Sequence, residues 1–149
     1  MPVYCDGRPC DRGSSSGGMT SEGGVTISLI NKTGSASVKG TVVIASTTID
    51  DAFDIASAGE VQPIGVVLDD GIADGSYCRV VISGRAQVLL EDAAPATRGY
   101  WVEVATATAG RATMLASPNA VTHWAELGHC LESVAGGTDV LAWCNLHFN

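Results

Sequence analysis

The residues that could carry chemistry in this chain are, first, its histidines and cysteines. His123, His129 and His147, together with the cysteines, are the residue types of a zinc site. Structural zinc sites usually contain closely spaced ligand pairs such as Cys-x-x-Cys, and the sequence has no such pair. Cys5 and Cys10, with four residues between them, are too weak a signal to change this. We therefore expect no metal site.

A nucleophilic site would require a Ser or Cys within reach of a His and a carboxylate. His129 and Cys130 are adjacent in sequence, but neighbouring side chains on a strand point to opposite faces, so these two would not pair. No Gly-x-Ser-x-Gly elbow follows an expected strand. Ser83-Gly84 and Ser133 are typical of turns. We expect no catalytic residues, and the enzyme class is the least favoured interpretation.

Acidic residues are the third candidate ligands. Asp69, Asp70 and Asp74 lie in a loop that could offer oxygen ligands to Ca²⁺. The spacing fails the EF-hand pattern, and Asp and Gly are ordinary turn residues. Asn31-Lys32-Thr33 matches a glycosylation sequon, which we interpret as incidental because no secretory signal is recognisable. We expect no bound ion and no cofactor.

The elements that must position these residues are predicted to be β-strands. Val25–Ile30 alternates apolar and polar residues with a period of two, and Gly40–Ala45 is a continuous run rich in β-branched residues. The only helical candidate is Thr48–Ala58. Asp74-Gly75 and Gly136-Gly137 are typical of hairpin turns with positive φ. Further strands are expected at 61–68, 78–82, 85–90, 101–104, 112–115 and 123–127, with a closing strand that runs to Phe148.

The order of these elements occurs twice, at a period of about sixty residues. A duplicated set of strands predicts an all-β fold, a small β-barrel or sandwich with an internal two-fold duplication, over residues 25–149. The first copy reads Ser28–Ile30, Val38–Ile44, Ile64–Asp70 and Cys78–Ile82, and the second reads Val88–Leu90, Thr97–Val104, Leu127–Ser133 and Asp139–Cys144.

Residues 1–24 have a different composition. Gly13–Gly18 and Glu22–Gly24 are rich in Gly and Ser, as in a flexible linker. The segment is predicted to be a flexible N-terminal arm, either a disordered tail or an arm that orders against a neighbouring chain. If it binds a partner, the contact residues are expected to be Val3, Tyr4, Arg8 and Pro9.

The formal net charge of −8 disfavours nucleic acid and anionic membranes as partners. No apolar run is long enough to span a membrane, and the sequence does not begin like a signal peptide, so we expect synthesis in a cytoplasm. Cys78, Cys130 and Cys144 lie in apolar runs and are expected to be buried, reduced thiols.

The tryptophans have two interpretations. Trp101, Trp124 and Trp143 all fall in the second copy. The favoured interpretation places them in the core or at the ends of a barrel. In the alternative they are anchors of a subunit interface, where Trp is enriched.

Two stretches of the sequence resemble tailed-bacteriophage capsid decoration (cement) proteins. The resemblance spans about residues 25–149 and does not include the arm. The motifs are Val38-Lys39-Gly40, Ile64-Gly65-Val66, Asp74-Gly75, Gly84–Leu90 and Gly99–Val102, followed by Leu127–Ser133, Gly137–Leu141 and Leu146–Asn149.

This resemblance implies a virion protein on the outer capsid surface, with the major capsid protein as partner. Such proteins stabilise the lattice of an expanded head, commonly as homotrimers, and the family has no catalytic residues to carry over. A flexible arm would add affinity once the β domain had docked. The alternative from the residues is a virion-surface module that binds host glycans, which clustered surface tryptophans would favour.

Overall fold

The computed structural model describes residues 4–5, 8–9, 17–118 and 123–148, and the fold is all-β, as predicted. A single 3₁₀ turn, His123–Ala125, is the only helix among these residues. Thr48–Ala58 is not helical, because Ala52–Ile55 forms a strand. The strands are β1 (Tyr4–Cys5), β2 (Arg8–Pro9), β3 (Gly18–Met19), β4 (Gly24–Asn31), β5 (Val42–Ala45), β6 (Ala52–Ile55), β7 (Gly65–Val67), β8 (Tyr77–Leu89), β9 (Trp101–Val104), β10 (Ala112–Leu115), β11 (Glu126–Cys130) and β12 (Leu141–Leu146).

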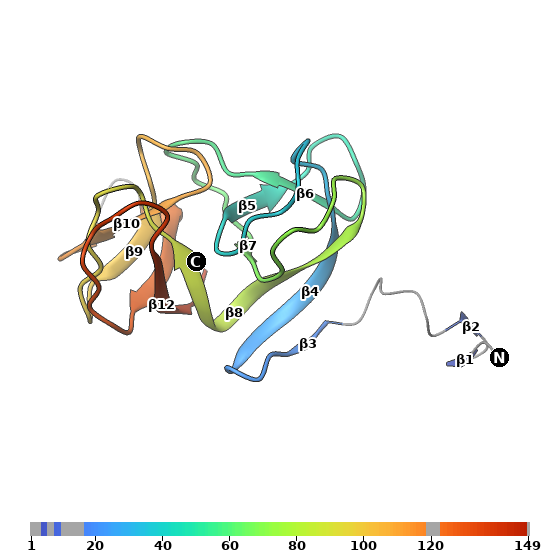
Figure 1. Cartoon of the computed structure of the whole chain (residues 1–149), viewed down its shortest axis with the longest axis horizontal. Helices are drawn as coiled ribbons and strands as arrows, with labels where there is room; N and C mark the ends of the chain where they lie inside the picture. The colour runs from blue at the N-terminus through green and yellow to red at the C-terminus, as the bar shows by residue number, and fades with distance from the viewer. Residues whose placement is uncertain (1–3, 6–7, 10–16, 119–122, 149) are drawn as a thin grey trace.

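The first half of the sheet closes on itself. β4 pairs with β8, β8 with β7, β7 with β5 and β5 with β6, all antiparallel. β6 then returns to β4 as a parallel pair, with Ile30 opposite Ala52 and Asn31 opposite Phe53. We call this closed set of β4–β7 and the first part of β8 the N-terminal ring (Figure 1).

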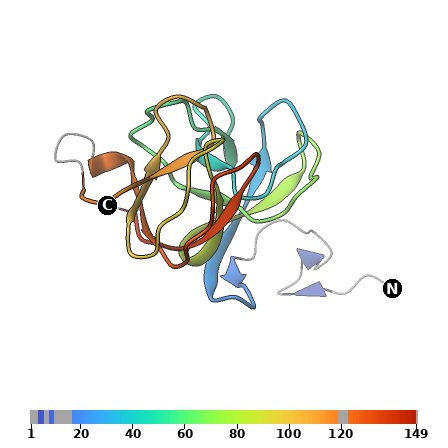
Figure 2. The same ribbon diagram turned by 60° about the vertical axis from the view of Figure 1, so that its left-hand side comes forward.

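The second half repeats this closure with other strands. The second part of β8 pairs with β12, β12 with β11, β11 with β9 and β9 with β10, again all antiparallel. A parallel bridge between Leu90 and Ala112 joins β10 back to the end of β8. These strands form the C-terminal ring, which lies beside the N-terminal ring in Figures 1 and 2.

The register of the pairs confirms the predicted duplication. Ala45 lies opposite Phe53 in the N-terminal ring, and their counterparts Val104 and Ala112 lie opposite each other in the C-terminal ring. The parallel contact between Asn31 and Phe53 likewise corresponds to the bridge between Leu90 and Ala112. Each counterpart lies about sixty residues further along the chain, as in an internal repeat.

Strand β8 belongs to both rings, which differs from the prediction of two separate strands with a turn at Ser83-Gly84. Gly84 has a φ of 81°, and a Cβ there would lie 2.4 Å from Gly23 O. Only glycine tolerates both this φ and this close approach, so the strand passes from one ring to the other without ending. Figure 1 shows β8 running along both halves of the molecule.

Apolar residues of alternating strand positions fill the two rings. Five residues form the cluster inside the N-terminal ring: Val43, Phe53, Val67, Cys78 and Val80. A larger cluster fills the C-terminal ring and continues to Val42, Val66 and Val81, which lie on the other face of the N-terminal strands. The packing of the two rings therefore forms one buried seam. Cys78, Cys130 and Cys144 are buried free thiols, as predicted.

The hairpin turns are only partly as predicted. Gly75 has positive φ, in the loop that joins the paired strands β7 and β8. In the loop between β11 and β12, the positive φ of 52° belongs to Asp139 rather than to Gly136 or Gly137. Gly136 is required for a different reason, since a Cβ there would lie 2.2 Å from Ala93 O.

Strand β3 extends the sheet to residues before position 25. Gly18 pairs with Thr26, and Met19 with Val25. No helix among the described residues is long and apolar enough to cross a membrane.

Candidate interaction surfaces

The three aspartates considered as Ca²⁺ ligands have separate protein partners. Asp69 forms a bidentate ion pair with Arg79, at 2.6 and 2.9 Å, and hydrogen bonding to Arg79 lowers the pKa of the Asp69 carboxyl. Asp70 accepts a hydrogen bond from Lys39 N, and Asp74 accepts one from Gly34 N. The loop carboxylates therefore brace turns of the N-terminal ring.

His129 and Cys130 point to opposite faces of β11, as predicted. Cys130 lies inside the C-terminal ring opposite Cys144, and a hydrogen bond with Cys130 together with burial raises the pKa of the Cys144 thiol. His129 lies outside the ring, where its Nδ1 is 2.7 Å from Nε2 of His147. This histidine pair was not predicted from the sequence. A strict period of two would put His129 on the same face as the buried Leu127, whereas the register shift between Glu126 and Gly128 places it on the outer face.

Trp101 completes an aromatic cluster on this outer face. Its ring centroid is 4.0 Å from that of His129 and 6.1 Å from that of His147. Trp101 and His129 are direct cross-strand neighbours in the β9–β11 pair. The cluster is half-buried and is held in place by strand register.

Two buried carboxylates lie beside this cluster. Glu103 and Glu126 are opposite each other on β9 and β11, and their exposed fractions are 6% and 3%. Oε2 of Glu103 has no hydrogen-bond partner among the described residues. Burial raises the pKa of Glu103, and the neighbouring charge of Glu126 raises it further. This pair was also missed, although Glu103 alternates with inward-facing valines.

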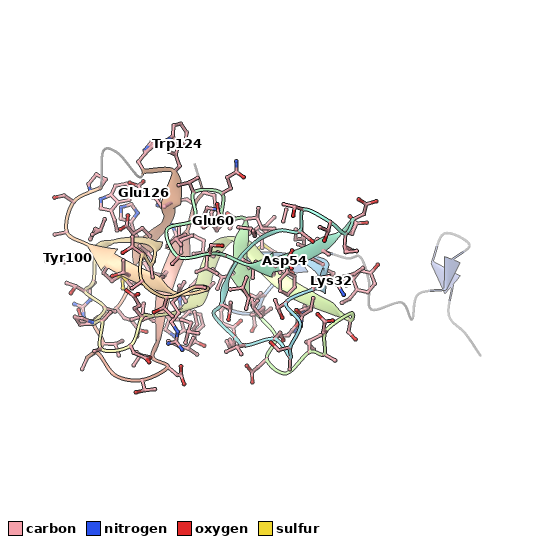
Figure 3. All side chains as sticks on the ribbon, turned by 90° about the horizontal axis from the view of Figure 1, so that it is seen from above. Lys32, Asp54, Glu60, Tyr100, Trp124 and Glu126 are labelled. Carbon is pink, nitrogen blue, oxygen red and sulfur yellow. The ribbon has the colours of Figure 1, made fainter. Side chains whose placement is uncertain are left out.

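Trp124 is the most exposed of the tryptophans and lies where the two rings meet. Its exposed fraction is 62%, and Figure 3 shows it projecting beyond Glu126 at the edge of the molecule. It lines a cavity of about 500 Å³ with Phe148 from the same ring and Val61, Gln62, Pro63 and Ile64 from the N-terminal ring. We call Val61, Pro63, Ile64, Trp124 and Phe148 the seam patch.

Of the favoured interpretation, the placement of the tryptophans in the core is wrong, and their placement at the ends of a barrel stays a prediction. Trp101 and Trp143 are half-buried on the outer face of the C-terminal ring, and the guanidinium carbon of Arg85 lies 3.9 Å from the centre of the Trp143 ring. Aliphatic residues and cysteines occupy the interior of this ring instead, such as Leu90, Leu127 and Cys144. The alternative, interface anchors, stays a prediction, and Trp124 has the exposure that it requires.

A second hollow, of about 580 Å³, lies on another part of the junction between the rings. Its lining includes Val38 and Ile55 from the N-terminal ring and Leu141 from the C-terminal ring. Arg111 also lines it and is bound by protein groups: it donates to Leu90 O at 2.9 Å and forms ion pairs with Asp92 and Asp139. This hollow is therefore part of the joint between the rings.

The arm residues are described only in part. Tyr4 lies opposite Pro9, and Cys5 opposite Arg8, in the antiparallel pair β1–β2. Val3 and Cys10 lie outside the described residues. The partner contact of Val3, Tyr4, Arg8 and Pro9 stays a prediction.

Comparison with known proteins finds a likeness among solved structures. No protein-family model matches the chain, and no curated protein matches its sequence. Among solved structures, the chain is similar to the N base of head fiber gp8.5 in bacteriophage phi29, with a TM-score of 0.54. The sequence identity is 16%, and the match covers 83% of this chain and 93% of that chain. At this identity the likeness is one of fold.

Proposed function

We propose that this chain is a structural protein of a phage virion, a decoration protein that binds the outer surface of the expanded head. The observation that carries the proposal is the shared fold with the base of a phage head fiber over most of both chains. The bound partner is the major capsid protein, and the protein acts as a homotrimer without catalysis. Its binding stabilises the capsid lattice mechanically.

The seam patch supplies a surface suited to this role. It presents an exposed Trp, the residue type most enriched at the energetic centre of protein interfaces. Val61, which is 46% exposed, adjoins it from the other ring. A capsid surface bound across the seam would contact both rings at once, and the shared strand β8 would carry load between them.

The test is co-sedimentation of the full chain with expanded, undecorated heads and with unexpanded procapsids. We expect saturable binding to expanded heads only, together with a higher temperature of head disruption. Trp124→Ala should weaken head binding at least tenfold, because it removes the anchor of the seam patch. Met19→Ala, which removes another exposed apolar side chain outside the patch, is the matched control. Absence of binding to either particle would contradict the proposal.

Glycan binding is the second candidate, and the exposed indole of Trp124 favours it because sugar rings stack on such faces. The other two indoles carry His129 and Arg85 on their rings, so they do not extend this surface. A glycan array probed with the wild-type chain and Trp124→Ala distinguishes the candidates. Binding that depends on Trp124, without head binding, would favour the glycan module.

A further inference from the structure

Because the two rings are repeats, each surface used in the contact between them has an equivalent surface on the other ring. The N-terminal ring packs on its neighbour through a row of three valines that crosses three strands. Val42 lies opposite Val66, and Val66 opposite Val81. All three are at most 1% exposed and belong to the core cluster of the C-terminal ring. We call this row the docking row.

The C-terminal ring has the same row in the same register. Trp101 lies opposite His129, and His129 opposite Asn145. These residues are the counterparts of Val42, Val66 and Val81, but no ring of the same chain covers them. Trp101 and His129 are half-buried, and Asn145 is exposed. Together with Tyr100, which is 37% exposed, and His147, they form what we call the terminal face.

The contact between the rings is head-to-tail, since each ring uses a different surface. The N-terminal ring contributes the docking row, while the C-terminal ring contributes part of its core cluster and the loop from Ala105 to Gly110. Val42 N donates to Gly110 O, and Gly59 N donates to Ala105 O, both at 2.8 Å. A head-to-tail contact leaves one unused surface of each kind. These are the terminal face of the C-terminal ring and the corresponding loop, residues 46–51, of the N-terminal ring.

The two unused surfaces carry complementary hydrogen-bonding groups, because carboxylates only accept and phenol, imidazole and amide groups can donate. The 46–51 loop carries Asp50 and Asp51, both exposed, beside Ile49, whose exposed fraction is 44%. The terminal face carries two imidazoles, a phenol and an amide around an indole, and none of its five residues is acidic. In Figure 3, Tyr100 lies at one end of the long axis, and Lys32 and Asp54 lie in the other half of the molecule.

We propose that the terminal face of one copy binds the 46–51 loop of a second copy of this chain. Repeated contacts of this kind close into a ring of subunits when the rotation allows it. This contact identifies the two surfaces through which the subunits of the proposed homotrimer would bind each other. It rests on the proposed function only for the number of subunits, which is three.

The contact between copies differs from the joint within the chain in one respect. Within the chain, Gly40 and Val42 enter between β8 and β10, where Leu89 N donates to Gly40 O at 2.9 Å. The corresponding gap in the N-terminal ring is closed, because Ile30 N donates to Asp51 O at 2.7 Å. Copies therefore meet surface to surface and do not exchange strands, which makes the association reversible and dependent on concentration.

The experiment uses two full-length variants, each with one damaged surface. Tyr100→Asp places a charge on the terminal face, and Asp50→Lys reverses a charge on the loop. By sedimentation velocity, the wild-type chain should form oligomers, and each variant alone should be monomeric at concentrations at least tenfold above the wild-type midpoint. An equimolar mixture of the two variants should form a dimer that grows no further, because one intact contact remains.

The controls carry the same kinds of change elsewhere. Glu22→Lys and Met19→Asp alter exposed residues outside both surfaces and should assemble like the wild type. A wild-type chain that stays monomeric at all concentrations, or variants that assemble normally, would overturn the proposal. So would a mixture that stays monomeric, since that result indicates a symmetric contact. If the wild-type chain bound heads while it remained monomeric, the contact between copies would be contradicted and the proposed head-binding function would stand.

Discussion

The two rings share one topology and are closed by different chemistry. In the N-terminal ring, the closing position is Asn31, which is fully buried and donates to Ser35 O and Ile72 O at 2.8 and 2.9 Å. Its counterpart in the C-terminal ring is Leu90, which is fully buried in the apolar core. One closure depends on hydrogen bonds to loop carbonyls, and the other on packing.

The residue opposite the closing position differs as well. Phe53 fills the N-terminal ring, whereas its counterpart Ala112 leaves that volume to Leu90. The C-terminal ring adds an external brace, Arg111, which donates to Leu90 O. Equivalent strands therefore do not require equivalent side chains, provided that each interior is filled and the polar groups at each closing position are hydrogen-bonded.

Phe53→Ala should have the largest effect. It gives the N-terminal ring the small residue that the C-terminal ring has at Ala112, but without the buried side chain of Leu90 that fills the space there. We expect a loss of about 4 kcal/mol in the free energy of unfolding from the cavity. Urea denaturation measures it, with Tyr77→Ala, at an exposed aromatic residue, as the control. A loss below about 1 kcal/mol would show that the ring collapses to fill the space.

Exchanging the closing residues tests whether closure by hydrogen bonds, as at Asn31, and closure by apolar packing, as at Leu90, can replace each other. Asn31→Leu leaves two loop carbonyls without their donor, and Leu90→Asn buries an amide among apolar side chains. Each should cost about 3 kcal/mol. The same denaturation experiment measures both variants. If either substitution were neutral, the chemistry of closure would not be specific to its ring.

Removing the external brace should have a smaller effect. Arg111→Met keeps the aliphatic stem and removes the donor to Leu90 O, together with ion pairs to two exposed aspartates. We expect a loss of about 1–2 kcal/mol, with little dependence on salt because the carbonyl bond contributes most. Arg98→Met, at an exposed arginine, should leave stability unchanged.

The smallest expected effect concerns pH. Because the pKa of Glu103 is raised in the folded chain, folding takes up protons above its ordinary value of 4.5, so this residue lowers stability as pH rises through that window. Glu103→Gln should therefore raise the free energy of unfolding at pH 7 by less than about 1 kcal/mol, seen as a higher urea midpoint, and should leave it unchanged at pH 3.5. Asp69→Asn should do the opposite: the lowered pKa of Asp69 stabilises the fold above 3.8, and this contribution is lost as pH falls. Equal midpoints for both variants and the wild type would contradict the assignment.

Much of the fold was predictable from the sequence, because strand periodicity and repeated order are local properties. The predicted strands at 101–104 and 112–115 coincide with β9 and β10. The strand predicted at 61–68 is only Gly65–Val67, since Pro63 has no N–H to donate to a ladder. The continuity of β8 through Gly84 was not predictable, because a glycine with positive φ also marks turns.

The candidate surfaces were harder to predict. Alternation shows that Trp101 and Glu103 share a face, but not whether that face is the interior of a ring or its exterior. The size of the interior decides this, and it depends on the pairing partners of every strand. The histidine pair and the seam patch join residues from different strands or rings, so they follow only from the tertiary register.

The sharing of β8 also has a consequence for synthesis on the ribosome. The N-terminal ring has all its strands once Ser83 has emerged, so it can close while the rest of the chain is still being made. The next residues of the same strand, from Arg85 to Leu89, then project from an already folded body. They offer a fixed edge on which β12 later pairs. We therefore expect the first repeat to act as a template for the second, with the strands assembling in the order in which they are translated.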